Sequence, residues 1–373
     1  MAKLNKVLVV GGGIGGMSAA ITLARCGAQV DLIDLDPGWR VYGAGITITS
    51  ATLRAFKALG ILDEVLADAY TGDGIQVCDR SGQRLGIVPT PAAEAGVPGC
   101  GGIMRPLLHG ILSRRTIEAR VRVRLGLTVD KLASDAEGVE VLFSDGDEAR
   151  YDVVIGADGV FSRVRELLFP AAPRPQYTGQ SVWRIVAHRP PQIDRRHFFL
   201  GGPVKVGLTP VSATQMYLFL LETTPRRPVL HEPQLSQELA RLLEGYGGPL
   251  ANILDQRVPG TSVVLRPLEG FLLPRPWHLG RTLLIGDAAH PTTPQLASGA
   301  GMAVEDGLVL GEELQRAQTV EEGLEGFMAR RYERCRLVVE NSLEIGRREQ
   351  CRAPIEEQTQ LVEQSLRVLA EPI

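Results

Sequence analysis

The pattern of apolar and polar positions predicts a strand, a helix and a second strand at the start of the chain. Residues 6–10 are almost entirely apolar, as expected of a parallel strand buried on both faces. Apolar residues then recur at helical spacing over residues 17–25, and Gly27 is a suitable C-cap. Apolar and polar residues alternate over residues 29–34, which predicts the second strand.

The middle of the chain has a different pattern. Helices are predicted over residues 52–59 and 106–114, and strands over residues 121–125, 139–143 and 151–155. From residue 170 to about residue 268 prolines are frequent, and strand patterns surround one helical segment. Those strands are predicted over residues 182–187, 216–221 and 262–265, and the helix over residues 234–243. This region favours a second domain with a largely antiparallel sheet.

The last part of the chain returns to the first pattern. Residues 282–285 predict a short buried strand, and helical sequence follows over residues 302–348 and again near the C-terminus. The fold class is therefore predicted to be α/β, with two interleaved domains. The first domain is assigned to residues 1–70, 100–170 and 270–330, the second to residues 71–99 and 171–269, and a C-terminal helical region to residues 331–373.

Composition narrows the class of protein without naming a function. The 373 residues are 44% hydrophobic and 22% charged, with a net charge of −3, which is typical of a globular protein. Such a balance gives no reason to expect a nucleic acid or an anionic membrane as partner. The five cysteines are far apart and lack C-x-x-C spacing, so neither a disulfide framework nor a metal site is predicted. A cytoplasmic location fits best.

The first chemical motif is a G-x-G-x-x-G sequence directly between the first strand and the first helix. Gly11 permits a tight turn, Gly13 allows a pyrophosphate to approach the backbone, and Gly16 allows close packing of helix and strand. The helix N-terminus favours the phosphate charge. Asp34 ends the second strand, where a carboxylate accepts hydrogen bonds from ribose hydroxyls. The combination predicts dinucleotide binding.

Two later motifs follow predicted strands. In residues 152–165 the strand ends in a turn that contains Asp158, which can cap the next helix, contact a cofactor, or do both. In residues 286–290 Asp287 follows a buried strand, where its carboxylate can bind a polyol chain. Pro294 and residues 299–301 come next, and the helix that begins there can direct N–H groups at developing negative charge.

In this order and at these separations, the three motifs resemble the FAD-dependent aromatic hydroxylases, single-component flavoprotein monooxygenases of the para-hydroxybenzoate and salicylate hydroxylase type. The resemblance covers nearly the whole chain. It implies a Rossmann-like FAD-binding domain interleaved with a mostly antiparallel β-sheet substrate domain, plus C-terminal helices. The cofactor-binding residues that it implies are Gly11, Gly13, Ile14, Gly15, Gly16, Asp34, Leu35, Arg105, Val129, Asp158, Asp287, Pro294, Gly299, Ala300, Gly301 and Met302.

The second and third motifs each depart from the family pattern. In the third motif the family commonly has G-x-G-x-N before the final helix, whereas this chain has alanine at 297 and glycine at 301. In the second motif Phe161 replaces a residue that is usually polar. Backbone contacts to the flavin can survive these changes, but contacts from the asparagine side chain cannot.

The resemblance implies a reaction. NADH or NADPH reduces the bound FAD, dioxygen adds at the flavin C4a carbon, and the resulting hydroperoxide hydroxylates a small aromatic or heteroaromatic ring. Because the chain has a single glycine fingerprint, the nicotinamide cofactor is expected to bind transiently near Asp158. No stable membrane association is expected, and the protein is expected to be a monomer or a homodimer.

The catalytic residue is not determined by the sequence. Arg184, His188, His197 and Tyr217 lie in the substrate domain and are weak candidates, because each can equally be an ordinary strand residue. Trp183 and Phe199 either line the pocket or fill the core. His290 is interpreted as part of the motif scaffold. A halogenase, an isoprenoid reductase and a ubiquinone-type hydroxylase remain alternatives on the same fold, although the halogenase W-x-W-x-I-P motif is absent.

Overall fold

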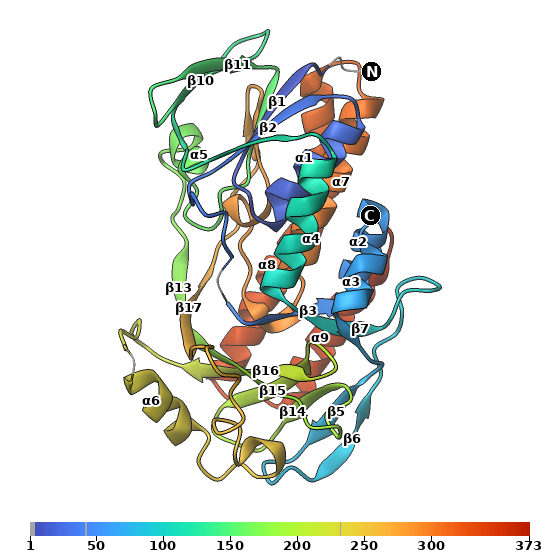
Figure 1. Cartoon of the computed structure of the whole chain (residues 1–373), viewed down its shortest axis with the longest axis vertical. Helices are drawn as coiled ribbons and strands as arrows, with labels where there is room; N and C mark the ends of the chain where they lie inside the picture. The colour runs from blue at the N-terminus through green and yellow to red at the C-terminus, as the bar shows by residue number, and fades with distance from the viewer. Residues whose placement is uncertain (1–3, 42, 232) are drawn as a thin grey trace.

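Two large sheets organise the structure, a computed structural model that describes residues 4–41, 43–231 and 233–373. A six-stranded sheet lies in the upper half of Figure 1, and a seven-stranded sheet lies in the lower half. The long helix α8 (Val320–Gln350) runs from one half to the other. The predicted α/β class, with a second sheet and C-terminal helices, is confirmed.

The six-stranded sheet has the order β18-β19-β12-β1-β2-β8, and all its strands except β18 run parallel. Its strands are β1 (Lys6–Val10), β2 (Gln29–Asp34), β8 (Arg122–Leu125), β12 (Val153–Gly156), β18 (His278–Leu279) and β19 (Thr282–Leu284). Residues 7–10 of the central strand are at most 2% exposed, because other elements cover both faces of the sheet. Residues 30–33 of β2 are buried for the same reason, so its predicted alternation is wrong although its bounds are right.

Helices pack around this sheet. Helix α1 (Ile14–Arg25) packs against α7 (Gly299–Arg316), which in turn contacts α8 and α2 (Ser50–Leu59). The remaining helices are α3 (Leu62–Asp68), α4 (Arg105–Glu118), α5 (Arg163–Leu168), α6 (Gln234–Leu242) and α9 (Ile355–Ala370). Helix α4 begins one residue before the predicted helix over residues 106–114 and ends four residues after it, so the predicted segment was too short.

The seven-stranded sheet has the order β17-β13-β16-β15-β14-β5-β6 and is antiparallel except between β14 and β5. Its strands are β5 (Ile75–Cys78), β6 (Arg84–Val88), β13 (Gln176–His188), β14 (Arg196–Phe199), β15 (Lys205–Pro210), β16 (Gln215–Thr223) and β17 (Val264–Gly270). Side chains alternate between its two faces. Trp183 and Ile185 pack in an outer core with Leu239 of α6, whereas Val186 and Tyr217 pack in a separate cluster on the other face, here called the inner face.

Two small antiparallel sheets complete the fold. One consists of β3 (Gly45–Thr49), β4 (Tyr70–Thr71) and β7 (Cys100–Met104), and β7 contacts β15 of the seven-stranded sheet. The other consists of β9 (Val129–Ser134), β10 (Val139–Phe143) and β11 (Glu148–Tyr151). The sheet of β3, β4 and β7 therefore joins the two halves of the molecule at the inner face.

Two predicted segments are wrong because each is interrupted. Residues 151–155 belong to two strands in different sheets, β11 and β12, and the chain turns at Asp152, whose carboxylate accepts the N–H groups of Asn5 and Lys6. The long helical stretch breaks between α7 and α8, where Thr319 caps the Glu322 N–H and the Glu322 carboxylate accepts the Gln318 N–H. The proposed boundary at residue 331 falls inside α8.

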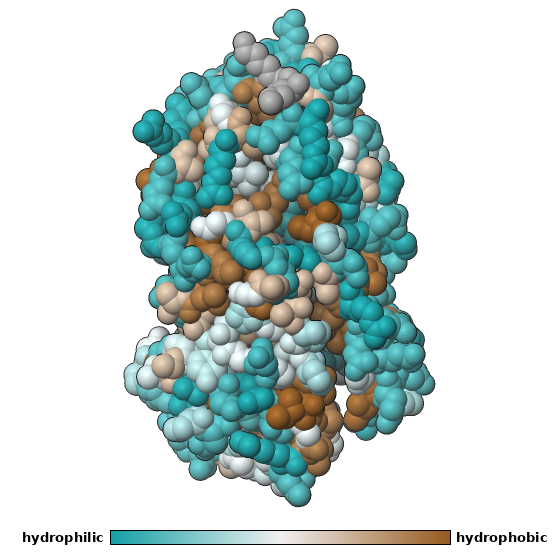
Figure 2. Space-filling model, turned by 90° about the vertical axis from the view of Figure 1, so that its right-hand side faces the viewer, coloured by the Kyte–Doolittle hydropathy of each residue, from teal (hydrophilic) through white to brown (hydrophobic). Residues whose placement is uncertain are grey.

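The surface carries mixed polarity. Figure 2 shows one face that is largely hydrophilic, with apolar residues gathered near mid-height and in a smaller patch near the lower end. Among the described residues no helix is long and apolar enough to cross a membrane.

Candidate cofactor and substrate site

The turn between β1 and α1 has the geometry that a pyrophosphate requires. Gly11 has a φ of +107°, and a Cβ on Gly16 would lie 1.8 Å from the Gly11 carbonyl oxygen. Gly13, by contrast, is exposed, and apart from its neighbours in the chain no atom of the described residues lies within 4 Å of the place where its Cβ would be. The space in front of the N-terminus of α1 is therefore open to an anion, which the free N–H groups there favour.

Asp34 is held against this glycine loop. Its Oδ2 accepts the Gly12 N–H at 2.7 Å, and its Oδ1 accepts the Asp36 N–H at 2.8 Å. The Trp39 indole N–H donates to the Gly12 carbonyl at 2.9 Å, and Trp39 packs edge-on against His109 of α4. Each Asp34 oxygen retains a second lone pair for a ribose hydroxyl. No sequence motif pointed to Trp39, because its contact with the loop arises only in the folded chain.

The second motif is tied to the third. The Asp158 carboxylate accepts the Ser162 hydroxyl at 2.5 Å and the Val164 N–H at 3.0 Å, so it caps α5, and burial raises its pKa. Arg165 of the same motif is buried and donates to the Ala288 carbonyl at 2.7 Å. The turn with Asp158 and the turn with Asp287 are therefore fixed relative to each other.

The third motif presents a carboxylate to open space. Gly286 has a φ of +57°, and the next residue, Asp287, has a solvent-accessible side chain at the start of a 3₁₀ turn. Although solvent reaches this side chain, the surrounding protein partly desolvates its carboxyl and raises the pKa, while the charges of His290 and Arg105 oppose the rise. Arg105, at the start of α4, thus lies within electrostatic range of Asp287. Residues 299–302 form the first turn of α7.

Both departures in the third motif have structural consequences. Ala297 has a φ of +50°, in the left-handed region that glycine adopts more easily. A Cβ on Gly301 would lie 2.4 Å from the Thr52 hydroxyl oxygen of α2. An asparagine at position 301 would therefore require the Thr52 side chain to shift, whereas glycine fits without any change.

The remaining predicted cofactor residues have contrasting surroundings. Val129 begins β9 with a fully buried side chain, so only its backbone is available to a ligand. Leu35 follows β2 and is 68% exposed. Both lie next to the end of β2, since the Leu127 N–H donates to the Asp34 carbonyl.

Arg184 is the candidate that the structure places beside the cofactor residues. It lies on β13, and burial followed by the nearby Arg105 charge lowers its pKa to about 10. Arg266 of β17 adds a third positive charge in range, and Tyr217 is the other group that acts on Arg184. Within residues 4–41, 43–231 and 233–373, the guanidinium of Arg184 makes no hydrogen bond or ion pair, although its backbone is paired in the sheet. Arg184 is half-buried, and a cation that is partly removed from water without a counter-ion carries an energetic cost, so its guanidinium is available to pair with a ligand.

Tyr217 lies next to Arg184 on the inner face. Its hydroxyl is 2.6 Å from the Thr47 hydroxyl oxygen of β3, and its ring is tilted against Phe219. This contact joins the inner face to the small sheet that continues into α4. Tyr217 is only 5% exposed, so it is fixed in place.

The other candidates are in different places. His188 is exposed at the end of β13, and the ring of His197 is held by a hydrogen bond to the Arg195 carbonyl. Trp183 and Phe199 belong to the outer core, on the opposite face of the sheet from Arg184. They fill the core and do not line the site.

Comparison with known proteins now decides the family. A family model described as an FAD binding domain matches residues 5–342. The chain belongs to this FAD-binding family. The aurachin C monooxygenase/isomerase of Stigmatella aurantiaca is 30% identical over 347 residues, which cover 91% of this chain and 88% of that protein. The FAD-dependent urate hydroxylase of Klebsiella pneumoniae subsp. pneumoniae is 28% identical over 348 residues, covering 90% and 88% of the two chains.

A solved structure agrees. Klebsiella pneumoniae HpxO complexed with FAD and uric acid superposes with a TM-score of 0.82 at 26% identity, covering 99% of this chain and 93% of that chain. The predicted kinship with FAD-dependent hydroxylases is confirmed, and the protein is an FAD-dependent oxidoreductase. The glycine loop and the first turn of α7 offer open space and N–H donors, and Asp34 and Asp287 offer carboxylate acceptors, a set of groups that FAD would fit.

A carboxylate that the sequence did not single out connects the two halves of this flavoprotein. Glu349 of α8 accepts the Lys205 ammonium at 2.7 Å, the Gln295 amide at 3.1 Å and the Gln180 amide at 3.3 Å. Gln295 follows Pro294, whereas Lys205 and Gln180 belong to the seven-stranded sheet. Glu349 thus fixes the loop before α7 against that sheet.

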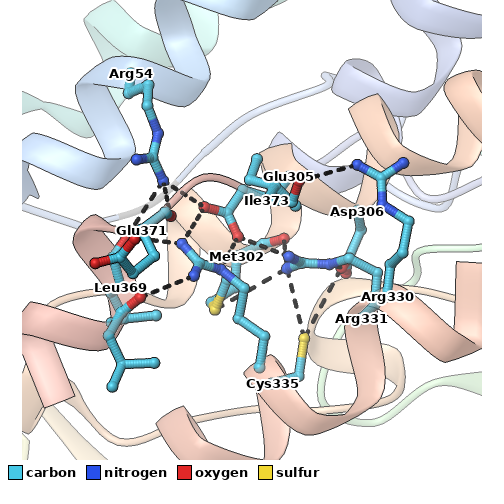
Figure 3. A network of polar contacts seen from close by, with 12 residues as sticks. Arg54, Met302, Glu305, Asp306, Arg330, Arg331, Cys335, Leu369, Glu371 and Ile373 are labelled. Carbon is cyan, nitrogen blue, oxygen red and sulfur yellow. Dashed lines mark hydrogen bonds and ion pairs between the residues drawn. The ribbon is translucent and has the colours of Figure 1, made fainter. Parts of the chain in front are cut away.

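A buried ionic cluster lies beneath the flavin motifs. His290 is 2.7 Å from the Asp306 carboxylate, and Arg331 of α8 donates to the same carboxylate at 2.8 Å. His290 therefore belongs to the scaffold, as predicted. The cluster includes Cys335 near Asp306, but the Arg331 guanidinium already occupies the side of Asp306 that a cation would need. Figure 3 shows the Arg331 guanidinium between Met302 and Asp306.

Proposed function

We propose that this flavoprotein is an NAD(P)H- and O2-dependent monooxygenase that hydroxylates a small heteroaromatic substrate at the inner face. The observation that carries the proposal is the half-buried Arg184 guanidinium, which has no counter-ion in the described residues and lies in electrostatic range of Tyr217 and Arg105. A ring that bears an ionised oxygen or nitrogen would supply the counter-charge that Arg184 lacks. Such a ring is electron-rich, as electrophilic oxygen transfer requires.

The residues have distinct roles in this proposal. FAD, when bound, supplies electron transfer from the nicotinamide cofactor to dioxygen and oxygen transfer to the ring. Gly13 and Asp34 would hold its pyrophosphate and ribose, Asp287 its ribitol chain, and the first turn of α7 its ring. Arg184 would bind and orient the substrate, and Tyr217 would hold or donate a proton at its hydroxyl oxygen.

Relatives support the choice of ring. They are named for urate hydroxylation and for the synthesis of a 3-hydroxy-4(1H)-quinolone, both of which involve nitrogen heterocycles. Arg184 and Tyr217 offer one cation and one hydroxyl, which suit a ring with an acidic N–H or O–H group.

The test is oxygen incorporation by the purified holoprotein. Urate, hydroxyquinolones and hydroxypyridine carboxylates are supplied with NADH or NADPH under isotopically labelled dioxygen, and products are identified by mass. The expected result is substrate-stimulated nicotinamide oxidation with one labelled oxygen atom in the product. Substrate conversion without labelled oxygen would contradict the proposal and favour a reductase, and a halogenated product in the presence of halide would favour a halogenase.

A further inference from the structure

The ionic cluster beneath the flavin motifs is more extensive than one ion pair. Arg331 donates to Asp306 through Nε at 2.8 Å and to Glu305 through Nη1 at 2.7 Å. Arg334, one turn further along α8, donates to Glu305 at 2.9 Å, and Arg54 of α2 approaches Glu305 at 4.0 Å. The side chains of Arg331, Glu305 and Asp306 are at most 2% exposed. Figure 3 shows Arg54 and Arg331 on either side of Glu305.

The cluster is bonded directly to both segments expected to contact the flavin. The Asp306 carboxylate accepts the N–H of Gly286, the residue before Asp287, at 2.8 Å. Arg331 Nη2 donates to the Met302 carbonyl, in the first turn of α7, at 3.0 Å. Charge in the cluster therefore acts at short range, through buried protein, on whatever ligand these segments hold.

Positive charge exceeds negative charge among the directly paired groups of this cluster, while Glu94 and Glu371 act on Arg54 from outside it. Three guanidinium groups, those of Arg54, Arg331 and Arg334, face two carboxylates, those of Glu305 and Asp306. His290 adds to the excess. Burial opposes its protonation, but the interactions with Cys335 and Asp306 outweigh burial and raise its pKa well above the ordinary value.

We propose that the cluster of Arg54, Glu305, Asp306, Arg331 and Arg334 sets the reduction potential of bound FAD. Two-electron reduction transfers the equivalent of a hydride to oxidised FAD and leaves one additional negative charge on its ring system. Positive charge that is bonded to the segments expected to hold the ring would stabilise the reduced form relative to the oxidised form. The cluster thus makes FAD easier to reduce. The inference rests on FAD binding, and it is independent of the proposed hydroxylation and of the substrate.

Two neutralising substitutions of opposite sign provide the test. Arg334→Gln removes a positive charge at the edge of the cluster, and Glu305→Gln removes a negative charge at its centre. Each variant is loaded with FAD, and the midpoint potential is measured anaerobically with a chemical reductant and a reference dye. We expect Arg334→Gln to weaken binding of reduced relative to oxidised FAD about tenfold, a shift of about 30 mV to more negative potential for a two-electron couple. We expect Glu305→Gln to shift the potential in the positive direction.

The matched control is Arg330→Gln. Arg330 precedes Arg331 on α8 but pairs with Glu312 and Glu313, outside the cluster. The midpoint potential of FAD bound to Arg330→Gln should equal that of FAD bound to the unmodified protein. Arg334→Lys keeps the charge and should restore most of the potential.

Two results would overturn the inference. One is an unchanged potential in both Arg334→Gln and Glu305→Gln, and the other is a shift of both in the same direction, which would indicate general loosening of the flavin site. If one variant does not fold, the sign of the shift in the other, against Arg330→Gln, decides. Because the reductant is chemical, a protein that binds FAD but hydroxylates none of the compounds contradicts the proposed function and leaves this test intact.

Discussion

The two walls of the candidate site are built in different ways. The cofactor wall consists of glycines, backbone N–H groups and carboxylates that are fastened to one another, as Asp34 is to Gly12 and Asp306 is to Gly286. The substrate wall consists of side chains on one face of a sheet, and its main cation, Arg184, has no partner in the described part of the chain. The cofactor wall is complete without its ligand, whereas the substrate wall is not.

This difference explains how one family can keep its cofactor and change its substrate. The glycine loop tolerates no added side chain at Gly11 or Gly16, because backbone atoms occupy that space. A side chain on a strand can be replaced without changing the strand, since backbone hydrogen bonds hold the sheet. Under the proposed function, substrate preference can therefore change at Arg184 or Tyr217 while the fold persists.

The largest effect is expected at the glycine loop. Gly16→Ala places a methyl group against the Gly11 carbonyl and should reduce the free energy of unfolding by about 3 kcal/mol or more. Gly13→Ala should leave the stability of the apoprotein almost unchanged but weaken FAD binding, because its Cβ would enter the open space. Urea unfolding and flavin titration separate these effects, with Gly110→Ala, also in open space, as control. If Gly13→Ala and Gly16→Ala reduced the stability of the apoprotein equally, the space beside Gly13 would not be open as the structure indicates.

A smaller effect, confined to the substrate wall, is expected for Arg184→Met. We expect kcat/KM for the substrate to fall about 100-fold, because a hydrogen bond to a charged group contributes about 3 kcal/mol. FAD affinity should change little, and Arg184→Lys should recover part of the activity. Steady-state kinetics and flavin titration test both points, with the exposed Arg226→Met as control. Loss of FAD together with activity would assign Arg184 to the cofactor wall.

Tyr217→Phe tests the contact that joins the two walls. Removing its hydroxyl breaks the hydrogen bond with Thr47, which should cost about 1 kcal/mol of stability. Thr47→Val should have a similar effect, and the double variant should lose less than the sum. Thermal or urea unfolding of the four proteins gives the coupling, and strict additivity would show that the two hydroxyls do not interact.

The smallest effect is expected at Ala297, within the cofactor wall. Ala297→Gly relieves a left-handed backbone conformation that costs an alanine about 1 kcal/mol, so the protein should become slightly more stable. Ala58 is exposed within α2, where alanine is more favourable than glycine. As a control with the opposite expected sign, Ala58→Gly should reduce the free energy of unfolding by a similar amount. Unfolding by urea compares the two, and destabilisation by both would show that position 297 is not strained.

The sequence by itself determined the strand and turn framework of the cofactor wall. The bounds of β1, β2 and β10 agree with the pattern, and the three motifs fall at strand ends, as parallel sheet topology requires. These features are local, because hydrophobic period, turn chemistry and glycine sterics act over a few residues. Tertiary structure alone decided the rest. Alternation along β13 shows that Arg184 and Trp183 face opposite ways, but only packing decides which face meets Arg105 and Tyr217. Likewise, Arg331 reaches Asp306 from a different helix, a contact between residues far apart in sequence that no local pattern encodes.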